Sequence, residues 1–315
     1  MTVNYAESYA KELANDYPYV LYSGALWSTE NTSKYKAVDA KTIKIPTLST
    51  NGRVDGDRTT IGDFSQNFSN DWETKTLKNH RVWQTLVHPQ DVNQTNMVAS
   101  ISKITKVMNE TQKFPELDAM MFSTLYSLRN AQEAITAETA DLTTNTVLTK
   151  FDAMMDAMDE ALVPVTGRIL YCDTFTKTLI DTAIAIVRSN GDKKLMRSVS
   201  NLDNVDIVSV PTALMKTAYT FNDGKTSGQT KGGFTPSTTA GDIAMMLVHP
   251  SCVLPIVSYS FAQMEAPSAL SQGKYVYFEE SFEDVFILNK RYNAIQICVK
   301  KAASTNRDKT EDTNK

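Results

Sequence analysis

The sequence contains few of the residues that build metal sites and disulfide frameworks. Its 315 residues include three cysteines and three histidines. Cys172, Cys252 and Cys298 are far apart, each lies in or beside an apolar run, and no CxxC pair occurs. This spacing excludes a zinc knuckle and a disulfide framework, so we expect three reduced thiols packed in the core.

Long hydrophobic runs and a basic excess are also missing. No apolar stretch approaches the roughly 20 residues that span a bilayer, so we expect no membrane partner. The first residues lack a charged leader followed by an apolar segment, and we expect no secretory signal. The net charge of −4 and the pI near 5.5 argue against a dedicated nucleic-acid binder, but permit a protein that merely encloses nucleic acid.

Motifs for catalysis or cofactor binding are absent as well. The segment 224–226 (Gly-Lys-Thr) resembles the end of a phosphate-binding loop, but Tyr219 stands where that motif requires glycine. Neither a GxSxG nor a GxGxxG turn occurs. The histidines stand in no HxxxH or HxE setting and are interpreted as surface or hydrogen-bonded core groups. They are His80, His88 and His249.

Two side-chain clusters on one predicted helix have a structural interpretation. The carboxylates fall on its polar side, which is typical of a solvated face rather than an acid–base pair. The methionines fall on its inward side and predict packing, in the core or at a subunit contact. The carboxylates are Asp152, Asp156, Asp159 and Glu160, and the methionines are Met154, Met155 and Met158. The sequence therefore predicts no catalytic, cofactor-binding or metal-binding residue, and no enzyme.

What the sequence does contain is an unusual order of elements between Ala40 and Leu128. A short alternating strand over 41–48, with Ile43 and Ile45 on one face, leads into about thirty-five polar residues. A second extended segment over 72–87 follows, so the pattern predicts a long two-stranded arm. An isolated hairpin is marginal in water. We therefore expect the arm to be laid against other copies of the chain.

Two helices are predicted directly after the arm. The first covers 92–111, because its apolar residues recur at intervals of three and four. Pro115 then restarts the chain at a first-turn position, with Glu116 and Asp118 near the positive end of the second helix. The apolar stripe of the first is Met97, Val98, Ile101, Ile104, Val107 and Met108, and that of the second is Leu117, Met120, Met121, Leu125 and Leu128.

The second half of the chain mixes strands and helices without a βαβ rhythm, which predicts an α+β fold. At 42% hydrophobic, the chain can bury a core in two lobes. A helix from Asn145 or Thr146, ended by Pro164, is predicted to bury Leu148, Phe151, Met154, Met155, Met158 and Leu162. A second helix is expected over 175–187, and strands over 168–172, 205–210, 243–248, 253–258, 275–278, 285–288 and 294–299. The glycine-rich segment 221–241 predicts a mobile loop, and 301–315 a disordered tail.

Several segments resemble the major capsid proteins of tailed bacteriophages. Residues 113–125 (KFPELDAMMFSTL) resemble the family signature "PEiDayrfskl". Residues 145–148 with 163–171 resemble its helix followed by "vPxxgRilyv", and 282–290 resemble its closing "yhDvfvlxnk" strand. Residues 204–211 add a weaker match. The matches occur in the family's order and extend over residues 40 to 299.

The resemblance implies the Hong Kong-97 capsid fold, in which an N-terminal arm, an extended loop, a peripheral domain with a spine helix, and an axial domain follow a set plan. Here the implied N-terminal arm is 1–39, the extended loop 50–86 and the axial domain 141–272. The implied peripheral domain combines 40–49, 87–140 and 273–300, with the spine helix at 92–111. His88-Pro89-Gln90-Asp91 replaces the acidic stretch usual before that helix.

The resemblance also implies a function. It is that of a shell protein of the virion, assembled in the host cytoplasm into hexamers and pentamers around double-stranded DNA that is not bound sequence-specifically. A portal protein is an implied partner, and the roughly 40 residues before the first strand favour a separate scaffolding protein. Two alternatives stay open: a bacterial nanocompartment (encapsulin-like) shell, and an enzyme that uses the glycine-rich loop as a lid.

Both charge signs occur along the predicted arm, and two tryptophans lie there. The charges are compatible with solubility or with pairing between subunits, and the tryptophans are candidate apolar anchors. The charged residues are Arg53, Asp55, Asp57, Arg58, Asp63, Asp71, Glu73, Lys75, Lys78 and Arg81, and the tryptophans are Trp72 and Trp83.

Overall fold

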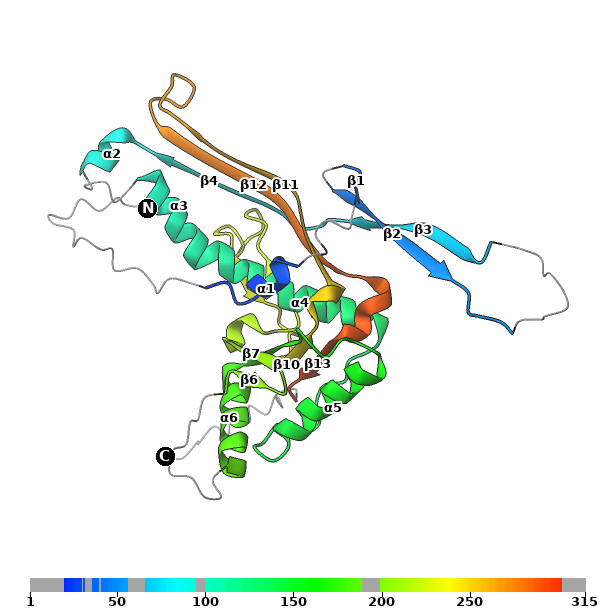
Figure 1. Cartoon of the computed structure of the whole chain (residues 1–315). Coiled ribbons are helices and arrows are strands. Elements are labelled where there is room, and N and C mark those ends of the chain that lie inside the picture. Colours follow the sequence, from blue (N-terminus) through cyan, green and yellow to red (C-terminus); the bar gives the residue numbers. More distant parts are fainter. Residues whose placement is uncertain are drawn as a thin grey trace, which may run out of the picture. The chain divides into compact units, whose positions relative to one another are not determined.

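The computed structural model describes residues 20–29, 31, 36–39, 41–55, 66–94, 100–188 and 199–301 (Figure 1). Within these residues the chain forms two compact units whose sequences interleave. Unit 1 comprises 26–111 and 253–286, and unit 2 comprises 20–25, 112–252 and 287–301. The predicted N-terminal arm and tail fall largely outside the described residues, as do Met97, Val98 and the tip of the predicted extended loop.

Unit 1 is built from two three-stranded sheets, ordered β1-β2-β3 and β11-β12-β4. Strands β1 and β3 each pair antiparallel with β2, and β4 pairs antiparallel with β12. The strands are β1 (Lys36–Ala37), β2 (Thr42–Thr50), β3 (Phe68–Thr76), β4 (His80–Val87), β11 (Val253–Glu265) and β12 (Tyr275–Ile287). Its helices are α2 (Pro89–Gln94) and α3 (Ile101–Met108), and α1 (Gly24–Trp27) lies where the sequence passes from unit 2 to unit 1.

The predicted return segment 72–87 is two strands in two different sheets, so that prediction was wrong. Three backbone hydrogen bonds mark the junction between β3 and β4. The Leu77 amide donates to the Lys41 carbonyl at 2.7 Å, and the Lys78 amide donates to the Asp284 carboxylate at 2.9 Å. The Glu283 amide donates to the Asn79 carbonyl at 3.1 Å. Residues 80–87 therefore pair with β12, and the arm proper ends at Thr76.

Strand β12 also differs from the prediction, because the segments 275–278 and 285–288 belong to one strand of 13 residues. The carboxylates between them interrupted the apolar pattern, whereas in the structure Glu279 and Glu280 pair with Trp83 and Val82 of β4. Strand β11 likewise continues seven residues beyond the predicted 253–258, to Glu265. Cross-strand pairing, which the local pattern does not encode, extends both strands.

The two predicted helices around Pro115 follow each other without a break. A π-helical turn, η2 (Asn109–Lys113), joins α3 to α4 (Phe114–Gln132), and both flanking cap residues keep helical dihedrals. A proline ring clashes with the carbonyl four residues earlier, here that of Thr111. Pro115 lies in the first turn of α4, as predicted, but the wider π turn before it lets the helical path continue from α3, so the two helices are not separated. Of the predicted helix over 92–111, residues 92–94 belong to α2, 95–99 lie outside the described residues, and α3 begins at Ile101.

Unit 2 is centred on a five-stranded sheet ordered β13-β10-β5-β7-β6, in which β5 and β7 run parallel. Strand β10 lies between β13 and β5 and is buried along its whole length, which fits its uninterrupted apolar sequence IAMMLV. The strands are β5 (Ile169–Asp173), β6 (Asn201–Leu202), β7 (Val205–Val210), β8 (Tyr219–Phe221), β9 (Phe234–Pro236), β10 (Ile243–Val248) and β13 (Ile295–Val299). The helices are α4, α5 (Val147–Glu160), α6 (Thr174–Arg188) and the short turns η3 (Thr212–Leu214), η4 (Pro250–Cys252) and η5 (Asn289–Ala294).

The core of unit 2 forms where α5 and α6 pack on this sheet. The predicted inward side of α5 is confirmed at Phe151, Met154 and Met158, which are buried. Leu148 and Met155 are partly buried against the same cluster. Leu162 contradicts the prediction, because it lies beyond the helix and is 91% exposed.

All three cysteines are free and buried, as predicted. Cys172 and Cys298 pack in the core of unit 2 beside α5 and α6. Burial raises the pKa of each of the three thiols to about 12, because the thiolate would lose its hydration.

The two units do not follow the domain bounds that the resemblance implies, and those bounds stay predictions. Residues 253–272 lie in unit 1, where β11 pairs with β12. Strand β13 pairs with β10 in the sheet of unit 2. The glycine-rich segment is not a plain loop, since β8 and β9 form a hairpin with Phe221 opposite Phe234.

Candidate assembly surfaces

The β2–β3 pair, called the arm here, is a ribbon whose distal half is exposed on both faces. Strand pairing places Pro46 opposite Trp72 and Thr50 opposite Phe68. From Pro46 to Thr50 and from Phe68 to Trp72, every residue is exposed or half-buried. No described residue of the chain covers this half, which fits the expectation that the arm needs a neighbour.

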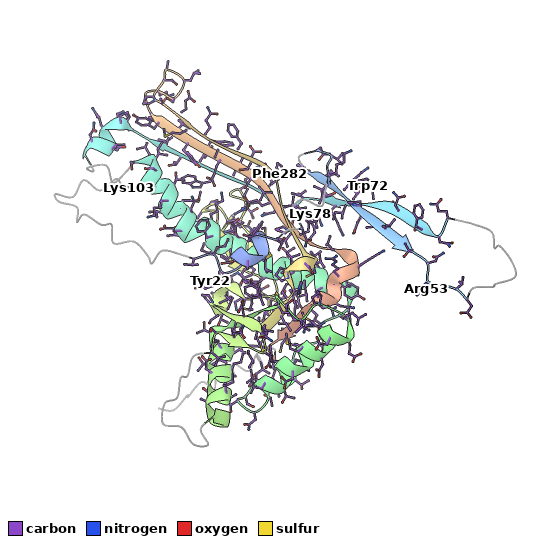
Figure 2. The ribbon with its side chains drawn as sticks, in the orientation of Figure 1. Tyr22, Arg53, Trp72, Lys78, Lys103 and Phe282 are labelled. Atoms are coloured by element: carbon purple, nitrogen blue, oxygen red, sulfur yellow. The ribbon has the colours of Figure 1, made fainter. Side chains whose placement is uncertain are left out.

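One face of the arm is apolar. Because side chains alternate along strands and directly paired residues share a face, Leu48, Phe68 and Trp72 lie together with Pro46. Leu48 is 62% exposed, Phe68 53% and Trp72 47%. Trp72 is labelled on the arm in Figure 2. We call this surface the apolar arm face, and an exposed set of large apolar side chains of this kind is typical of an interaction site.

The opposite face of the arm is polar. The hydroxyl groups of Ser49 and Ser69 lie 2.6 Å apart, and the Thr47 hydroxyl donates to the Asp71 carbonyl at 3.1 Å. These cross-strand hydrogen bonds satisfy the polar side chains within the ribbon. The arm is therefore amphipathic although little of it is buried.

The base of the arm is held to the β11-β12-β4 sheet by packing. Ile43 and Ile45, which were predicted to share one face of the strand, are both buried. The Lys41 ammonium group lies 5.5 Å from the centre of the Phe282 ring, and the His80 ring stacks on that ring at 4.1 Å. The His80 Nε2 atom also lies 2.9 Å from a Glu280 carboxylate oxygen. The base is fixed, whereas the distal half has no such support among the described residues.

The charged residues predicted along the arm differ in position, exposure and pairing. Lys75 pairs with Glu73 of the same strand, so both charges are used within the chain. Arg53, Asp55 and Asp71 are exposed. Lys78 lies at the base, and Arg81 belongs to β4 rather than to the arm. Asp57, Arg58 and Asp63 lie outside the described residues.

A second exposed apolar surface lies on the β11-β12-β4 sheet. Val82 and Leu86 alternate along β4, and Phe278 of β12 lies opposite Gln84 on the same face. The Phe261 ring of β11 contacts the Phe278 ring, with centroids 6.2 Å apart. Val257, four residues before Phe261, shares this face by strand alternation. The exposed members, called the Val82 face, are Val82 (52%), Leu86 (62%), Val257 (47%) and Phe261 (39%).

Trp83 does not provide the exposed anchor that the sequence predicted. Its ring packs against Tyr277 on the other face of the sheet, with centroids 5.5 Å apart, and its side chain is half-buried. The exposed apolar side chains beside Trp72 are Leu48 and Phe68, which were not predicted as anchors. Only the spacing of Pro46 and Leu48 carried a signal, because Asn70 interrupts the alternation between Phe68 and Trp72.

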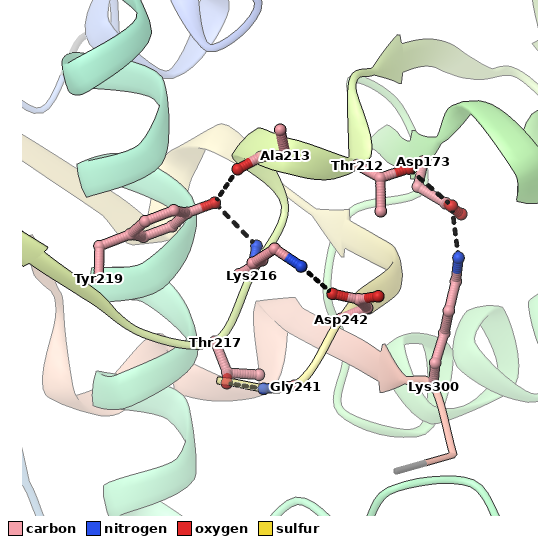
Figure 3. A network of polar contacts seen from close by, with 9 residues as sticks. All are labelled: Asp173, Thr212, Ala213, Lys216, Thr217, Tyr219, Gly241, Asp242 and Lys300. Carbon is pink, nitrogen blue, oxygen red and sulfur yellow. Dashed lines mark hydrogen bonds and ion pairs between the residues drawn. The ribbon is translucent and has the colours of Figure 1, made fainter. Parts of the chain in front are cut away.

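Unit 2 contains a network of polar contacts that fixes the ends of its strands (Figure 3). The buried Asp173 carboxylate accepts hydrogen bonds from the Lys300 ammonium at 2.5 Å and the Thr212 hydroxyl at 3.3 Å. Lys216 pairs with Asp242 at 2.5 Å. Each carboxylate is thus already neutralised by a lysine, which is the arrangement of a structural contact rather than of a general base.

The turn at 224–226 does not form a phosphate-binding site. The Asp223 carboxylate accepts hydrogen bonds from the amides of Lys225 and Thr226 at 2.8 Å and from the Thr226 hydroxyl at 2.7 Å. These bonds, that of the Thr226 amide first, lower the pKa of Asp223 to about 2. The amides that would bind a phosphate are occupied by the chain's own carboxylate.

The remaining candidate groups contact different partners in the two units. His80 contacts Glu280 in unit 1, whereas His249 of unit 2 lies 3.1 Å from the Thr166 carbonyl. The predicted acidic face of α5 is exposed. A partial loss of hydration at Asp152, followed by the negative charges of Asp203 and Asp156, raises the pKa of its carboxyl group. In the part of the chain that the structure describes, no group of three His, Cys, Asp or Glu residues is arranged to hold a metal ion.

Among the described residues, no helix combines the length and apolar character needed to cross a membrane.

The structure is similar to solved phage capsid structures. With the capsid structure of the cyanophage P-SCSP1u, the TM-score is 0.65 at 11% sequence identity, covering 95% of this chain and 93% of the other. With the mature capsid of bacteriophage PhiM1, the TM-score is 0.62 at 12% identity, covering 94% and 92%. With the capsid of Ralstonia phage GP4 it is 0.58 at 10% identity, covering 96% of both chains. No family model and no curated protein matches the chain.

These comparisons confirm the predicted α+β phage-capsid fold over nearly the whole chain. At such identities a likeness shows the fold alone. The nanocompartment alternative receives no support from them.

Proposed function

We propose that this chain is the major capsid protein of a tailed bacteriophage and that copies of it assemble into the shell enclosing the phage DNA. One observation carries the proposal: a chain with the phage-capsid fold exposes both faces of an amphipathic arm. A ribbon of this kind is stable when another surface covers its apolar side.

A second copy supplies that surface in this proposal. The apolar arm face of one copy packs on the Val82 face of the next, which removes Leu48, Phe68 and Trp72 from water. Burying one such side chain contributes about 1.5–3 kcal/mol, and association opposes part of this gain. Each contact is then modest, and a closed shell becomes stable because every copy both gives and receives an arm.

The partners follow from this role. The shell is composed of hexamers and pentamers of the chain, with a portal protein at one position and a separate scaffolding protein that guides closure. The weak net negative charge of −4 suits a wall that encloses DNA without gripping it, because a strongly basic lining would bind phosphates. The chain belongs to the virion and assembles in the host cytoplasm. Unit 1 corresponds to the peripheral domain and unit 2 to the axial domain.

Deletion of residues 54–70 tests the proposal. The deletion removes the distal end of the arm but keeps Ile43, Ile45 and the packing at its base. We expect a folded monomer with an unchanged far-ultraviolet circular dichroism spectrum that forms no shells in sedimentation velocity. Normal particles from the deleted chain would refute the role of the arm, and a wild-type chain that never associates would refute the function.

A further inference from the structure

The loop that follows α5 presents apolar side chains to solvent. Leu162 is 91% exposed and Val165 49%, and Pro164 between them is exposed as well. We call Leu162 and Val165 the knob. Both belong to unit 2, whereas the arm and the Val82 face belong to unit 1.

The backbone at Leu162 is in the left-handed region, with φ of 57°. The Val163 amide donates to the Met158 carbonyl at 3.0 Å and the Leu162 amide to that of Asp159 at 2.9 Å, which places Leu162 where helices commonly end in glycine. The other non-glycine residues with positive φ in the described chain are polar: Asp203, Asn204 and Gln272. A leucine here is unfavourable for the isolated subunit, both in its dihedrals and in its exposure.

The knob is held in place by buried polar groups. The Arg168 guanidinium, whose side chain is fully buried, donates to the carbonyls of Val163 at 2.7 Å and Pro164 at 2.9 Å. Burial lowers the pKa of His249, and its Nδ1 atom accepts a hydrogen bond from the Ser251 amide. The neutral ring therefore carries its proton on Nε2, which donates to the Thr166 carbonyl at 3.1 Å. The loop is preordered, and a preordered apolar projection loses little entropy when it binds.

We propose that the knob is a contact between copies of this chain, seated on unit 2 of the next subunit. The inference rests on the proposed function and adds to it a contact that the arm does not make. A strained, exposed and immobilised leucine is explained if its side chain is buried in the assembly.

Charge indicates that the occupant is another copy. The surface of α5 leading to the knob carries Asp152, Asp156 and Glu160, all exposed, which would repel nucleic acid and other polyanions. The β8–β9 connection of the same unit carries the exposed Lys225 and Lys231 and one carboxylate, Asp223, whose oxygens accept hydrogen bonds within their own turn, so its net charge is positive. A head-to-tail contact pairs the acidic surface of one copy with the lysines of the next, and contacts of this type close into rings.

The substitutions Leu162→Gly and Leu162→Met separate the side chain from the backbone. Glycine adopts the observed φ without strain, so L162G removes the knob and should unfold at the same or a higher temperature than the wild type. We expect the protein concentration at half assembly, measured by sedimentation velocity, to rise about tenfold or more for L162G. For L162M, which keeps an apolar side chain, we expect a change of no more than about twofold.

The outcomes separate this inference from the proposed function. If L162G assembles at the wild-type concentration, the knob makes no contact and the inference is overturned while the shell function stands. If L162M is as defective as L162G, or if L162G unfolds at a lower temperature, the role assigned to the apolar side chain is wrong. If the wild type itself stays monomeric, the proposed function fails and this inference fails with it.

Discussion

The buried side chain of Arg168 in unit 2 makes several hydrogen bonds, and only one of its partners is a carboxylate. Its guanidinium donates to two backbone carbonyls, to the Asp159 carboxylate, and to the sulfur of Met155 at 3.5 Å. The carbonyls belong to the turn after α5, where helical hydrogen bonding ends. One arginine thus satisfies two carbonyls of the turn, while the Leu162 and Val163 amides bind the carbonyls of Asp159 and Met158 at the helix end.

Replacing Arg168 by methionine should destabilise the monomer. The methylene volume is largely retained, but the carbonyls of Val163 and Pro164 lose their donor in a buried setting. We expect a loss of about 3 kcal/mol in the free energy of unfolding, measured by urea denaturation. The control is Asp159→Asn, whose side chain is 52% exposed, and for which a loss below about 1 kcal/mol is expected. Equal losses from both variants would contradict this account of the turn.

Sequence reasoning at the residue scale succeeded where burial follows periodicity. Phe151 and Met158 were predicted to be buried and are, and Ile43 and Ile45, predicted to share a face, are both buried. Leu162 was wrongly included because the helical period was continued past the helix end. Glycine commonly marks a left-handed helix end of this kind, but leucine stands here, so nothing in the sequence indicated that the helix stops.

At the scale of elements, the arm is the feature on which the proposed function rests. Its first strand was predicted from the alternation over 41–48, and the register of Pro46 opposite Trp72 determines which residues share a face. The end of the arm was not predictable from the pattern, because β3 and β4 read as one extended run. Three hydrogen bonds made by distant residues divide that run.

Paired substitutions on either face of the arm should leave the stability of the monomer unchanged. Only those on the apolar arm face should weaken assembly. For Leu48→Ser with Phe68→Ser, we expect an unfolding free energy within about 0.5 kcal/mol of the wild type, because both side chains are exposed in the monomer. The half-assembly concentration should rise at least about a hundredfold, since two apolar side chains leave the contact.

The control for that pair is Thr47→Ala with Ser69→Ala on the polar arm face. These substitutions keep the register and remove two cross-strand hydroxyl groups, and we expect the half-assembly concentration to change less than about threefold. A larger effect from the polar pair than from the apolar pair would contradict the assignment of the contact to the apolar arm face.

At the scale of the whole molecule, the chain visits each unit more than once. This interleaving explains why the fold class was predictable while the residue ranges of the two units were not. The α+β class follows from the local patterns of helices and strands. Placing 253–272 in unit 1 and β13 in the sheet of unit 2 requires knowledge of pairing between segments far apart in sequence.

The expected separate scaffolding protein also belongs to this scale. In the proposed assembly the apolar arm face and the Val82 face provide contacts between copies, but they do not by themselves specify how many copies close a shell. We therefore expect the chain expressed alone to form curved and closed particles of mixed size. Abundant particles of one size would show that no separate scaffold is needed.

Electron microscopy of the purified full-length chain tests the central claim most directly. Negative-stain images across a range of protein concentrations should show thin-walled, shell-like particles that become more numerous as the concentration rises. A preparation that contains only folded monomers at every concentration would contradict the claim that copies of this chain cover one another's arms.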